Sequence, residues 1–498
     1  MVRLTAAQAD RACGVLLGAA CGDALGAGYE FGVVPIPPPG ERPAMIGGGL
    51  GGFAPGEWTD DTAQTFAVAA VAATGADLRT TPALDAVALS LSNWYAGGPA
   101  DVGIQTGRVL RAAGAKPTAA VMTAAAREMH DRTGRSGGNG SLMRTSVVAL
   151  AHLHDPVALV EAAAAVSSLT HTDQRAGQAC ALWCLAIRDA VLHGRFRDPR
   201  AGLGYLPEES QAFWLERLDE AERQDPTSFR PNGYVATALQ AAWSAITHTP
   251  ETAHVPQAGR FACDHLVDAL EAAVRIGDDT DTVASIAGAL LGARWGASAF
   301  PAQWRRVVHG WPGVTAGDLV NLALLTVNAG KPDGSGWPGC PSIDYGGWAG
   351  HDSFAVHPLD PQVFLSGAST LTDLPRDVTA VVTLCRLGRD QVPAHLRGKH
   401  VEFRILDTNA DDNPNLEYVI DDAARTIARF RGEGETVLLH CAAAHSRTPT
   451  VAARYGVLLG IPVQRSIDEV CAVLPEAHPN QALVAALRRL GEPGPTPT

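Results

Sequence analysis

The spacing of apolar residues divides the chain into two regions. Up to about residue 325, Ala-rich stretches carry apolar residues at helical spacing, and alternating strand patterns are almost absent. These stretches are residues 4–26, 62–74, 82–97, 156–169, 174–194, 233–246 and 282–296. Because small residues occupy so many helix faces, the helices can pack closely. The pattern predicts an all-α N-terminal domain over residues 1–327.

A different pattern begins near residue 355. Short β-branched runs bounded by turn residues predict strands at 363–368, 378–385, 401–407 and 436–441. Helical stretches lie between and after them, at 415–432, 448–460, 466–475 and 480–491. Strands that alternate with helices predict an α/β C-terminal domain over residues 355–490. Residues 328–354, dense in Gly, Pro, Asp and Ser, predict a linker, and residues 491–498 a disordered tail.

Composition narrows the classes of protein. The chain of 498 residues has room for about two to four domains, and 46% hydrophobic with 18% charged residues excludes wholesale disorder. No apolar run of 18 or more residues lacks charge, and the start has no basic segment followed by an apolar one. We therefore expect neither a membrane span nor a secretory signal.

Charge and cysteine content add two expectations. The net charge of −13 argues against nonspecific binding to nucleic acid or to an anionic membrane. The nine cysteines are odd in number and form no Cys-x-x-Cys pair. They predict reduced, mostly buried thiols in a cytoplasmic protein.

Two acidic clusters stand before apolar helices, EWTDDT at residues 57–62 and IGDDTDT at 276–282. One such cluster is typical of helix capping. Two clusters with five Asp in all crowd like charges, which oppose folding unless a cation or a partner offsets them. Carboxylates and Thr hydroxyls are hard ligands that suit Mg²⁺, Mn²⁺ or Ca²⁺. If the two helix starts meet, we expect them to bind two cations.

Between the clusters lies a Gly-rich turn, SGGNGSLMR at residues 136–144, followed by a helical run. Such a turn exposes backbone N–H groups to an anion. It lacks the spacing and the Lys of a nucleotide P-loop.

Together these segments resemble the ADP-ribosylglycohydrolase family. The stretches that carry the resemblance appear in family order over about residues 10–325: GVLLGAACGDALGAGYEF, GEWTDDTAQTFAVA, GGNGSLMRTS, SSLTHTDQRAG and VRIGDDTDTVASIAGALLGARWG. The resemblance implies an all-α fold with two divalent cations, Mg²⁺ or Mn²⁺. The implied metal ligands are Thr59, Asp60, Asp61, Asp279, Asp281 and Thr282. Asp278 stands where many members have Gly and is left out.

The same resemblance implies the other site residues. Glu30 matches a carboxylate implicated in catalysis, with a surface or capping Glu as the alternative. The diphosphate would lie on Gly137, Gly138, Asn139, Gly140 and Ser141. His171 would contact the distal or adenosine side of the ligand, unless it is a structural His, and Asp101 would face the substrate.

The residue types fit glycosidic bond cleavage, which passes through an oxocarbenium-like state. Metals can orient the ribose and lower the pKa of a bound water. A nearby carboxylate, Asp60, Asp61 or Glu30, can then take or give a proton.

A second constellation lies at a predicted strand–helix turn. Cys441 ends the strand run, and the loop Ala442, Ala443, Ala444, His445 and Ser446 leads into a helix. The loop N–H groups and the helix dipole would favour the thiolate, and Arg447 can hold two phosphate oxygens. The thiolate would then lie below the phosphorus for in-line attack. A buried strand Cys followed by an ordinary cap is the alternative.

This region, about residues 355–490, resembles the dual-specificity cysteine phosphatases. Their pattern His-Cys-x5-Arg-Ser/Thr is met by His440, Cys441, Arg447 and Thr448. The resemblance implies a phosphorylated cysteine intermediate, no metal, and Thr448 assisting its breakdown. It also implies a general acid, for which Asp407 fits best, with Asp411 and Asp412 as alternatives.

One position departs from that pattern, because Ala444 stands where the family usually has Gly. If this position needs a positive φ, Ala strains the loop by about 1 kcal/mol.

The sequence therefore predicts a bifunctional, multidomain hydrolase. An all-α ADP-ribosylglycohydrolase-like domain would remove ADP-ribose from protein, nucleic acid or a small molecule. An α/β cysteine-phosphatase-like domain would hydrolyse phosphorylated substrates. One alternative makes the second domain a phosphate- or ADP-ribose-binding module with little turnover, and another makes the whole chain a scaffold. The linkage cleaved, the choice between Mg²⁺ and Mn²⁺, and the oligomeric state stay open.

Overall fold

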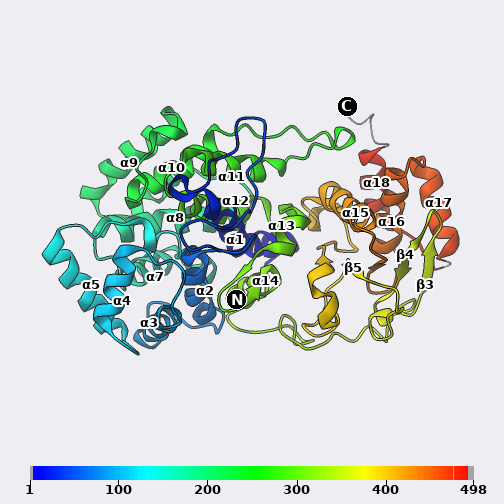
Figure 1. Ribbon diagram of the computed structural model, residues 1–498, viewed down its shortest axis with the longest axis horizontal. Helices are drawn as coiled ribbons and strands as arrows, with labels where there is room; N and C mark the ends of the chain where they lie inside the picture. Colours follow the sequence, from blue (N-terminus) through cyan, green and yellow to red (C-terminus); the bar gives the residue numbers. More distant parts are fainter. Residues whose placement is uncertain (1–3, 475, 492–498) are drawn as a thin grey trace.

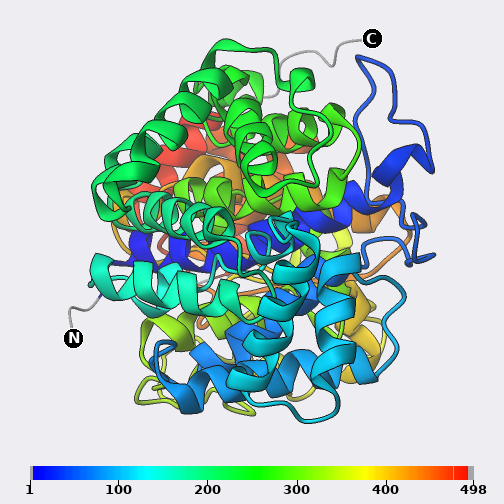
Figure 2. The same ribbon diagram turned by 90° about the vertical axis from the view of Figure 1, so that its left-hand side faces the viewer.

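The computed structural model describes residues 4–474 and 476–491. A helical half occupies the left of Figure 1, and a half built on a small sheet occupies the right. Figure 2, turned so that the helical half faces the viewer, shows the second half lying behind it. Most of the predicted disordered tail, residues 492–498, lies outside the described residues.

Helices make up nearly all the regular secondary structure of the N-terminal half. They are α1 (Ala6–Gly26), α2 (Asp60–Ala72), α3 (Thr81–Ala96), α4 (Ile104–Ala113), α5 (Ala119–Thr133), α6 (Val148–Ala151), α7 (Pro156–Ser168), α8 (Gln174–His193), α9 (Glu208–Arg223), α10 (Val235–His248), α11 (Asp264–Ile276), α12 (Thr280–Trp295), α13 (Ala302–Val307) and α14 (Ala316–Val327). A two-residue antiparallel pair, β1 (His309–Gly310) and β2 (Val314–Thr315), interrupts them. The prediction of a helical N-terminal half is confirmed, with this small hairpin as the exception.

Helices α1 and α12 pack backbone to backbone at the centre of the helical half. A Cβ added to Gly18 would lie 2.0 Å from the carbonyl oxygen of Gly288, so no larger residue fits there. The Ala-rich composition is thus explained by close helix approach. The segment Ala6–Gly32 is long and apolar enough to cross a membrane by length and composition alone, yet its apolar window is completely buried, as in a core helix.

The C-terminal half contains one five-stranded sheet with strand order β3-β4-β7-β5-β6. Its elements are β3 (Phe354–His357), β4 (Asp360–Ser366), β5 (Ala380–Thr383), β6 (His400–Glu402), β7 (Val437–His440), α15 (Leu416–Gly432), α16 (Arg447–Leu458), α17 (Val463–Val473) and α18 (Gln481–Leu490). Strand β3 runs antiparallel to β4, and the other pairs are parallel. This confirms an α/β arrangement, and β3 is a strand that the sequence pattern did not predict.

The register of the parallel strands fixes where the cysteine loop emerges. Ser366 of β4 and Thr383 of β5 both pair with His440 of β7. Their carboxyl ends therefore lie side by side, and Cys441 follows directly at that edge.

The Gly/Pro-rich segment predicted as a linker packs along this same edge. The N–H of Arg389 donates to the carbonyl of Cys340 (2.9 Å), and the N–H of Ser369 donates to the carbonyl of His351 (3.1 Å). The segment therefore contacts the chain that follows β5 and β4, and does more than join the two halves.

The two halves are held against each other by specific contacts. The N–H of Ala302 at the start of α13 donates to Asp422 Oδ2 of α15 (2.9 Å). Phe261 meets Tyr418 edge-on, with ring centroids 5.4 Å apart. The halves thus share an interface built from both polar and aromatic groups.

Candidate active sites

The two acidic clusters meet, although more than 200 residues separate them along the chain. Thr59 is the N-cap of α2 and Asp279 is the N-cap of α12. The Thr59 hydroxyl donates to Asp281 Oδ2 (3.2 Å), and the Thr282 hydroxyl donates to Asp61 Oδ2 (3.2 Å). Each cluster thereby contributes a hydroxyl to a carboxylate of the other.

Glu30 joins this centre from the turn that follows α1. Its carboxylate lies with those of Asp279 and Asp281, and one oxygen of each lies within 4.8 Å of the other two. The turn is held because Phe31, in a left-handed conformation with φ of 46°, donates its N–H to the carbonyl of Asp278 (2.7 Å). Sequence analysis placed Glu30 among the catalytic residues; the structure groups it with the candidate ligands.

The donor set fits divalent cations. Glu30 Oε2 and Asp61 Oδ1 are buried and have no hydrogen-bond partner among the described residues. Unpaired buried carboxylate oxygens are costly unless a cation satisfies them. Burial, followed by the neighbouring carboxylates, raises the pKa of Glu30 to about 8. The same two causes raise the pKa of both Asp61 and Asp281 well above the ordinary value.

Asp60 is buried at the edge of the centre, next to the segment that carries Asp101 and Gly103. Its Oδ2 accepts from the N–H of Gly103 (3.2 Å) and from Gln64 Nε2 (2.9 Å). Burial, and next the charge of Asp101, raises the pKa of Asp60 to about 7. Asp101 therefore lies near enough to act on Asp60, while its own Oδ1 accepts from the N–H of Val102 (2.8 Å).

The Gly-rich turn lies against the same centre. Asn139 Nδ2 donates to Asp279 Oδ2 (2.7 Å), which ties the turn to α12. A Cβ added to Gly138 or Gly140 would lie 3.4 Å from His171 Nε2, so the turn and the imidazole are neighbours. The structure thus brings together the acidic centre, the turn and His171.

Two details of the turn differ from the sequence-based expectation. The Ser141 hydroxyl is buried and accepts from Ser167 Oγ (2.9 Å), so Ser141 has only its backbone to offer a ligand. The turn opens a short 3-10 segment, Asn139–Ser141, and the helix after it, α6, has four residues. Local Gly content predicted the turn but not the length of the helix.

Sequence analysis missed Asp23, whose carboxylate accepts hydrogen bonds from the first acidic cluster. It is fully buried in α1, and it accepts from the N–H groups of Thr59 and Thr62 (both 2.9 Å) and from the Thr62 hydroxyl (2.6 Å). Burial raises the pKa of Asp23 to about 6. A carboxylate within the long apolar stretch of α1 that follows Arg11 was the signal that could have found it.

A buried chain of polar groups, also missed, links the acidic centre to His171. Gln64 joins Asp60 to Arg144, whose Nη1 donates to Gln64 Oε1 (2.8 Å). Arg144 Nη2 donates to Thr170 Oγ1 (2.7 Å), which is hydrogen-bonded in turn to His171 Nδ1 (2.7 Å). Because Arg144 is fully buried, burial lowers its pKa to about 10; its partners Gln64 and Thr170 are neutral, and its Nε has no hydrogen-bond partner among the described residues.

The cysteine loop lies at the other end of the molecule. Cys441 is 2% exposed, and its N–H donates to the carbonyl of Ser366 (3.4 Å). His440 is buried beside it, with Nε2 hydrogen-bonded to Thr383 Oγ1 (2.8 Å), and burial lowers its pKa to about 4. A neutral His440 therefore braces two adjacent strands beneath the loop.

Arg447 begins α16 and turns back over the strand ends. Its Nη1 donates to the carbonyls of Leu384 (2.9 Å) and Ile405 (3.3 Å), while its buried Nε has no hydrogen-bond partner within the described residues. An anion in the loop would supply the missing acceptor. The buried Thr448 hydroxyl donates to the carbonyl of Ser366 (3.4 Å).

The loop contains one strained residue. Ala444 has a φ of 55°, a left-handed conformation in which a Cβ costs about 1 kcal/mol. Position 444 therefore does need a positive φ, and Ala strains the loop as expected. The next residue, His445, is bonded to Glu476 (Nε2 to Oε2, 3.1 Å) and lies over His478, with ring centroids 4.9 Å apart.

The general-acid candidates lie on one loop next to this site. Asp407 and Asp411 are exposed and Asp412 is half-buried. Asn480 connects that loop to the cysteine loop, because its Nδ2 donates to the carbonyl of Thr408 (3.1 Å) and its N–H to Ser446 Oγ (2.9 Å).

Comparison with known proteins supports the family resemblance of the helical half. Residues 4–333 match the family described as ADP-ribosylglycohydrolase. The ADP-ribosylarginine hydrolase Tri1 of Pseudomonas putida is 30% identical over 309 residues, 60% of this chain and 75% of that protein. The ADP-ribosyl-[dinitrogen reductase] glycohydrolase of Rhodospirillum rubrum is 27% identical over 304 residues, 59% of this chain and 89% of that protein. The chain belongs to the ADP-ribosylglycohydrolase family.

Solved structures add likenesses for both halves. An ADP-ribosylglycohydrolase-related protein complex covers 65% of this chain and 99% of its own, with 25% identity and a TM-score of 0.46. Human DUSP28 covers 28% of this chain and 93% of its own, with 19% identity and a TM-score of 0.25. At these TM-scores neither likeness establishes a fold.

Proposed function

We propose that the helical half cleaves an ADP-ribosyl glycosidic bond with two divalent cations, Mg²⁺ or Mn²⁺. The family and its relatives support ADP-ribosyl hydrolysis as the activity. The observation that carries the metal requirement is the meeting of two acidic clusters whose buried oxygens, Glu30 Oε2 and Asp61 Oδ1, have no partner among the described residues. The ligands would be Thr59, Asp60, Asp61, Asp279, Asp281 and Thr282, with Glu30 beside them.

When bound, the cations would supply the positive charge that orients the ribose hydroxyls and activates a water molecule. The chain's own groups do the rest. Asn139 holds Asp279, and the N–H groups of Gly137, Gly138 and Gly140 are available to a diphosphate. Glu30 or Asp60 would exchange a proton with the attacking water or the leaving group.

The substrate is proposed from the relatives. One relative is named for ADP-ribosylarginine and the other for ADP-ribosylated dinitrogen reductase. We therefore propose an ADP-ribosylated protein, with arginine linkage as the first candidate. A panel of arginine-, serine-, nucleic-acid- and O-acyl-linked ADP-ribose, assayed with Mg²⁺, with Mn²⁺ and with chelator, tests this. Release from other linkages only would contradict the arginine assignment, and full release from metal-free protein in chelator would contradict the cation requirement.

A second candidate function, supported by different residues, is cysteine-dependent hydrolysis of phosphate monoesters by the C-terminal half. The supporting observation is Cys441 at the carboxyl edge of a parallel sheet, beside an Arg447 whose buried Nε lacks an acceptor. The Cys441 thiolate would attack phosphorus, forming an S–P bond as the P–O bond breaks. The leaving oxygen would take its proton from Asp407, and water would then hydrolyse the S–P bond.

Turnover distinguishes this function from a binding module. Phosphate release from an aryl phosphate should depend on Cys441 and need no metal. Binding of phosphate or ADP-ribose without turnover would support the module instead, with Ala444 as the strained position that impairs catalysis.

A further inference from the structure

The loop that carries the general-acid candidates is closed on itself. Asn413 Oδ1 accepts from the N–H of Leu406 (2.7 Å), and Asn413 Nδ2 donates to the carbonyl of Leu406 (3.0 Å). This pair of bonds joins the two ends of residues 406–413. Since Asp407, Asp411 and Asp412 all lie on this closed loop, their position depends on what holds its ends.

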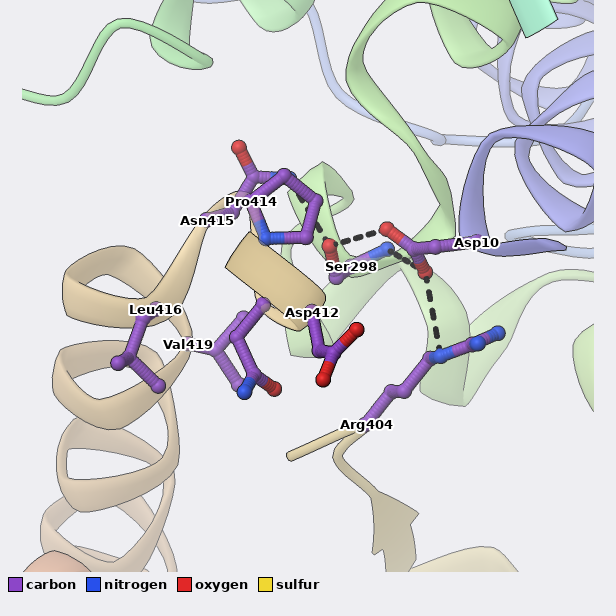
Figure 3. Close-up of a pocket in the computed structure, with 9 residues that line it drawn as sticks. Asp10, Ser298, Arg404, Asp412, Pro414, Asn415, Leu416 and Val419 are labelled. Atoms are coloured by element: carbon purple, nitrogen blue, oxygen red, sulfur yellow. Dashed lines mark hydrogen bonds and ion pairs between the residues drawn. The ribbon is translucent and has the colours of Figure 1, made fainter. Parts of the chain in front are cut away.

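The incoming end of the loop is attached to the helical half. Arg404 Nη2 donates to the carbonyl of Ala6, the first residue of α1 (2.9 Å), and Nε lies 4.0 Å from Asp10 Oδ1. Asp10 is only 1% exposed and is fixed by Ser298, whose N–H and hydroxyl donate to it (3.2 and 2.6 Å). Figure 3 shows Arg404 linked to Asp10, and Asp10 linked in turn to Ser298.

The outgoing end is attached to the same place. Asn415 Nδ2 donates to the carbonyl of Trp295, the last residue of α12 (2.7 Å), and to Ser298 Oγ (2.9 Å). Asp412 lines the small cavity between these two anchors, as Figure 3 shows. One polar cluster of the helical half, formed by Asp10 and Ser298, thus holds both ends of the acid loop.

Fewer hydrogen bonds hold the loop to its own half. Apart from packing, the contacts that tie it to the cysteine loop are Arg447 to the carbonyl of Ile405 (3.3 Å) and Asn480 to the carbonyl of Thr408 (3.1 Å). The exposed Asp407 has no hydrogen bond within the described residues that would fix it directly. The ends of the loop therefore decide where its carboxylates stand.

We propose that the ADP-ribosylglycohydrolase half positions the acid loop of the C-terminal half, with Arg404 and Asn415 as the positioning residues. The helical half would then be a structural part of the second active site. This inference rests on the proposed phosphatase function for its catalytic consequence, but the holding of the loop is a property of the fold and can be measured without turnover.

Hydrogen exchange of the full chain tests the holding directly. Arg404→Ala and Asn415→Ala should each raise exchange of residues 406–413 by about tenfold, as expected for the loss of one or two anchoring hydrogen bonds. Arg404→Lys should restore part of the protection. Arg397→Ala is the matched control, because this exposed Arg, among the residues that the structure describes, bonds only to Arg389 and Asp390 of its own half. Unchanged exchange in both anchor variants would overturn the proposal.

The catalytic consequence is read from leaving groups. In the anchor variants phosphate release should fall about tenfold for esters with poor leaving groups and change little for a nitrophenyl ester, since only the former need the acid. Asp407→Asn should show the same pattern, and combining it with Arg404→Ala should add little. If exchange rises but the unaltered chain releases no phosphate, the positioning stands and the phosphatase function fails. Equal losses for both kinds of ester would contradict a role through the acid.

Discussion

The acidic centre and the cysteine loop are built in opposite ways. The acidic centre gathers side chains from segments that lie far apart in the sequence, including Asp61, Asn139 and Asp281. The cysteine loop is one continuous stretch from Cys441 to Arg447, and the groups it is proposed to offer an anion are backbone N–H groups and the Arg447 side chain. The first concentrates negative charge, which cations would offset in the proposed function, whereas the second is proposed to bind an anion without a metal. Removing the cations should therefore abolish the activity proposed for the acidic centre and leave the activity proposed for the cysteine loop unchanged.

Despite this difference, both regions depend on the α1–α12 pair. The pair carries Asp23 and Asp281 near one end, and Asp10 with Trp295 at the other. Its close backbone packing leaves no room for a Cβ at Gly18. The core helices of the helical half thus also contact the two ends of the acid loop.

The largest expected effect is at Cys441. Cys441→Ser should lower phosphate release by about 10⁴-fold or more, because the nucleophile is lost, and leave ADP-ribose release unchanged. Cys471→Ser, which alters a half-exposed thiol away from the loop, is the control. Wild-type phosphate release by Cys441→Ser would show that this loop is not the catalytic centre of a phosphatase.

The reciprocal variants are Asp60→Asn and Asp281→Asn. Each should lower ADP-ribose release by about 10³-fold, since each removes a charged ligand from the acidic centre, and leave phosphate release intact. Asp278→Asn is the matched control, because Asp278 has a φ of 60° that Asn also tolerates and is not among the proposed ligands. Equal activity of Asp281→Asn and the control would contradict the ligand assignment.

Stability should depend on pH and on cations together. The pKa values of Asp23, Asp60 and Glu30 are raised to about 6, 7 and 8, so the folded chain favours their protonated forms. In chelator, these three carboxyl groups should not lower the free energy of unfolding below about pH 4. As the pH rises through their pKa values, the free energy of unfolding should fall, by on the order of 3 kcal/mol for Asp23 alone. Chemical denaturation at pH 5 and pH 8 measures this.

Cations should reverse that loss. Added Mg²⁺ or Mn²⁺ binds the folded state, so the unfolding free energy at pH 8 should recover. Asp60→Asn should show a shallower pH dependence in chelator. If the metal-free chain is equally stable at both pH values, the claim that repulsion among these buried carboxylates destabilises the fold is wrong.

The smallest effect is expected at Ala444. Ala444→Gly relieves a left-handed Ala and should change stability by about 1 kcal/mol or less, because the added freedom of the unfolded chain offsets part of the gain. Phosphate release should rise modestly. Ala443→Gly, next to it, lacks the positive φ and should not stabilise the chain.

The parts of the structure that local pattern governs could be predicted. Helical spacing predicted α1 and α12, and β-branched runs predicted β4, β5 and β7. The two Asp clusters could be identified because helix capping, which readily explains one such cluster, does not readily explain two. The hydrogen bonds from Thr59 to Asp281 and from Thr282 to Asp61 could not be predicted from spacing, because they depend on how the two helix starts approach each other.

The rest depended on tertiary contacts that no local pattern encodes. Asp23, Gln64 and Arg144 act through partners brought together only by folding. Strand β3 escaped prediction because it is four residues long, with Phe354 and Val356 exposed. The contacts of Arg404 and Asn415 with the helical half join segments nearly 400 and 120 residues apart, respectively.

One measurement tests the central claim, that a cation-dependent centre and a cation-independent thiol site share one chain. ADP-ribose release from ADP-ribosylarginine protein and phosphate release from an aryl phosphate are followed in the same metal-free sample, before and after adding Mg²⁺ or Mn²⁺. ADP-ribose release should be absent without cation and appear with it, while phosphate release stays constant. Loss of both activities in chelator, or retention of both, would contradict the account.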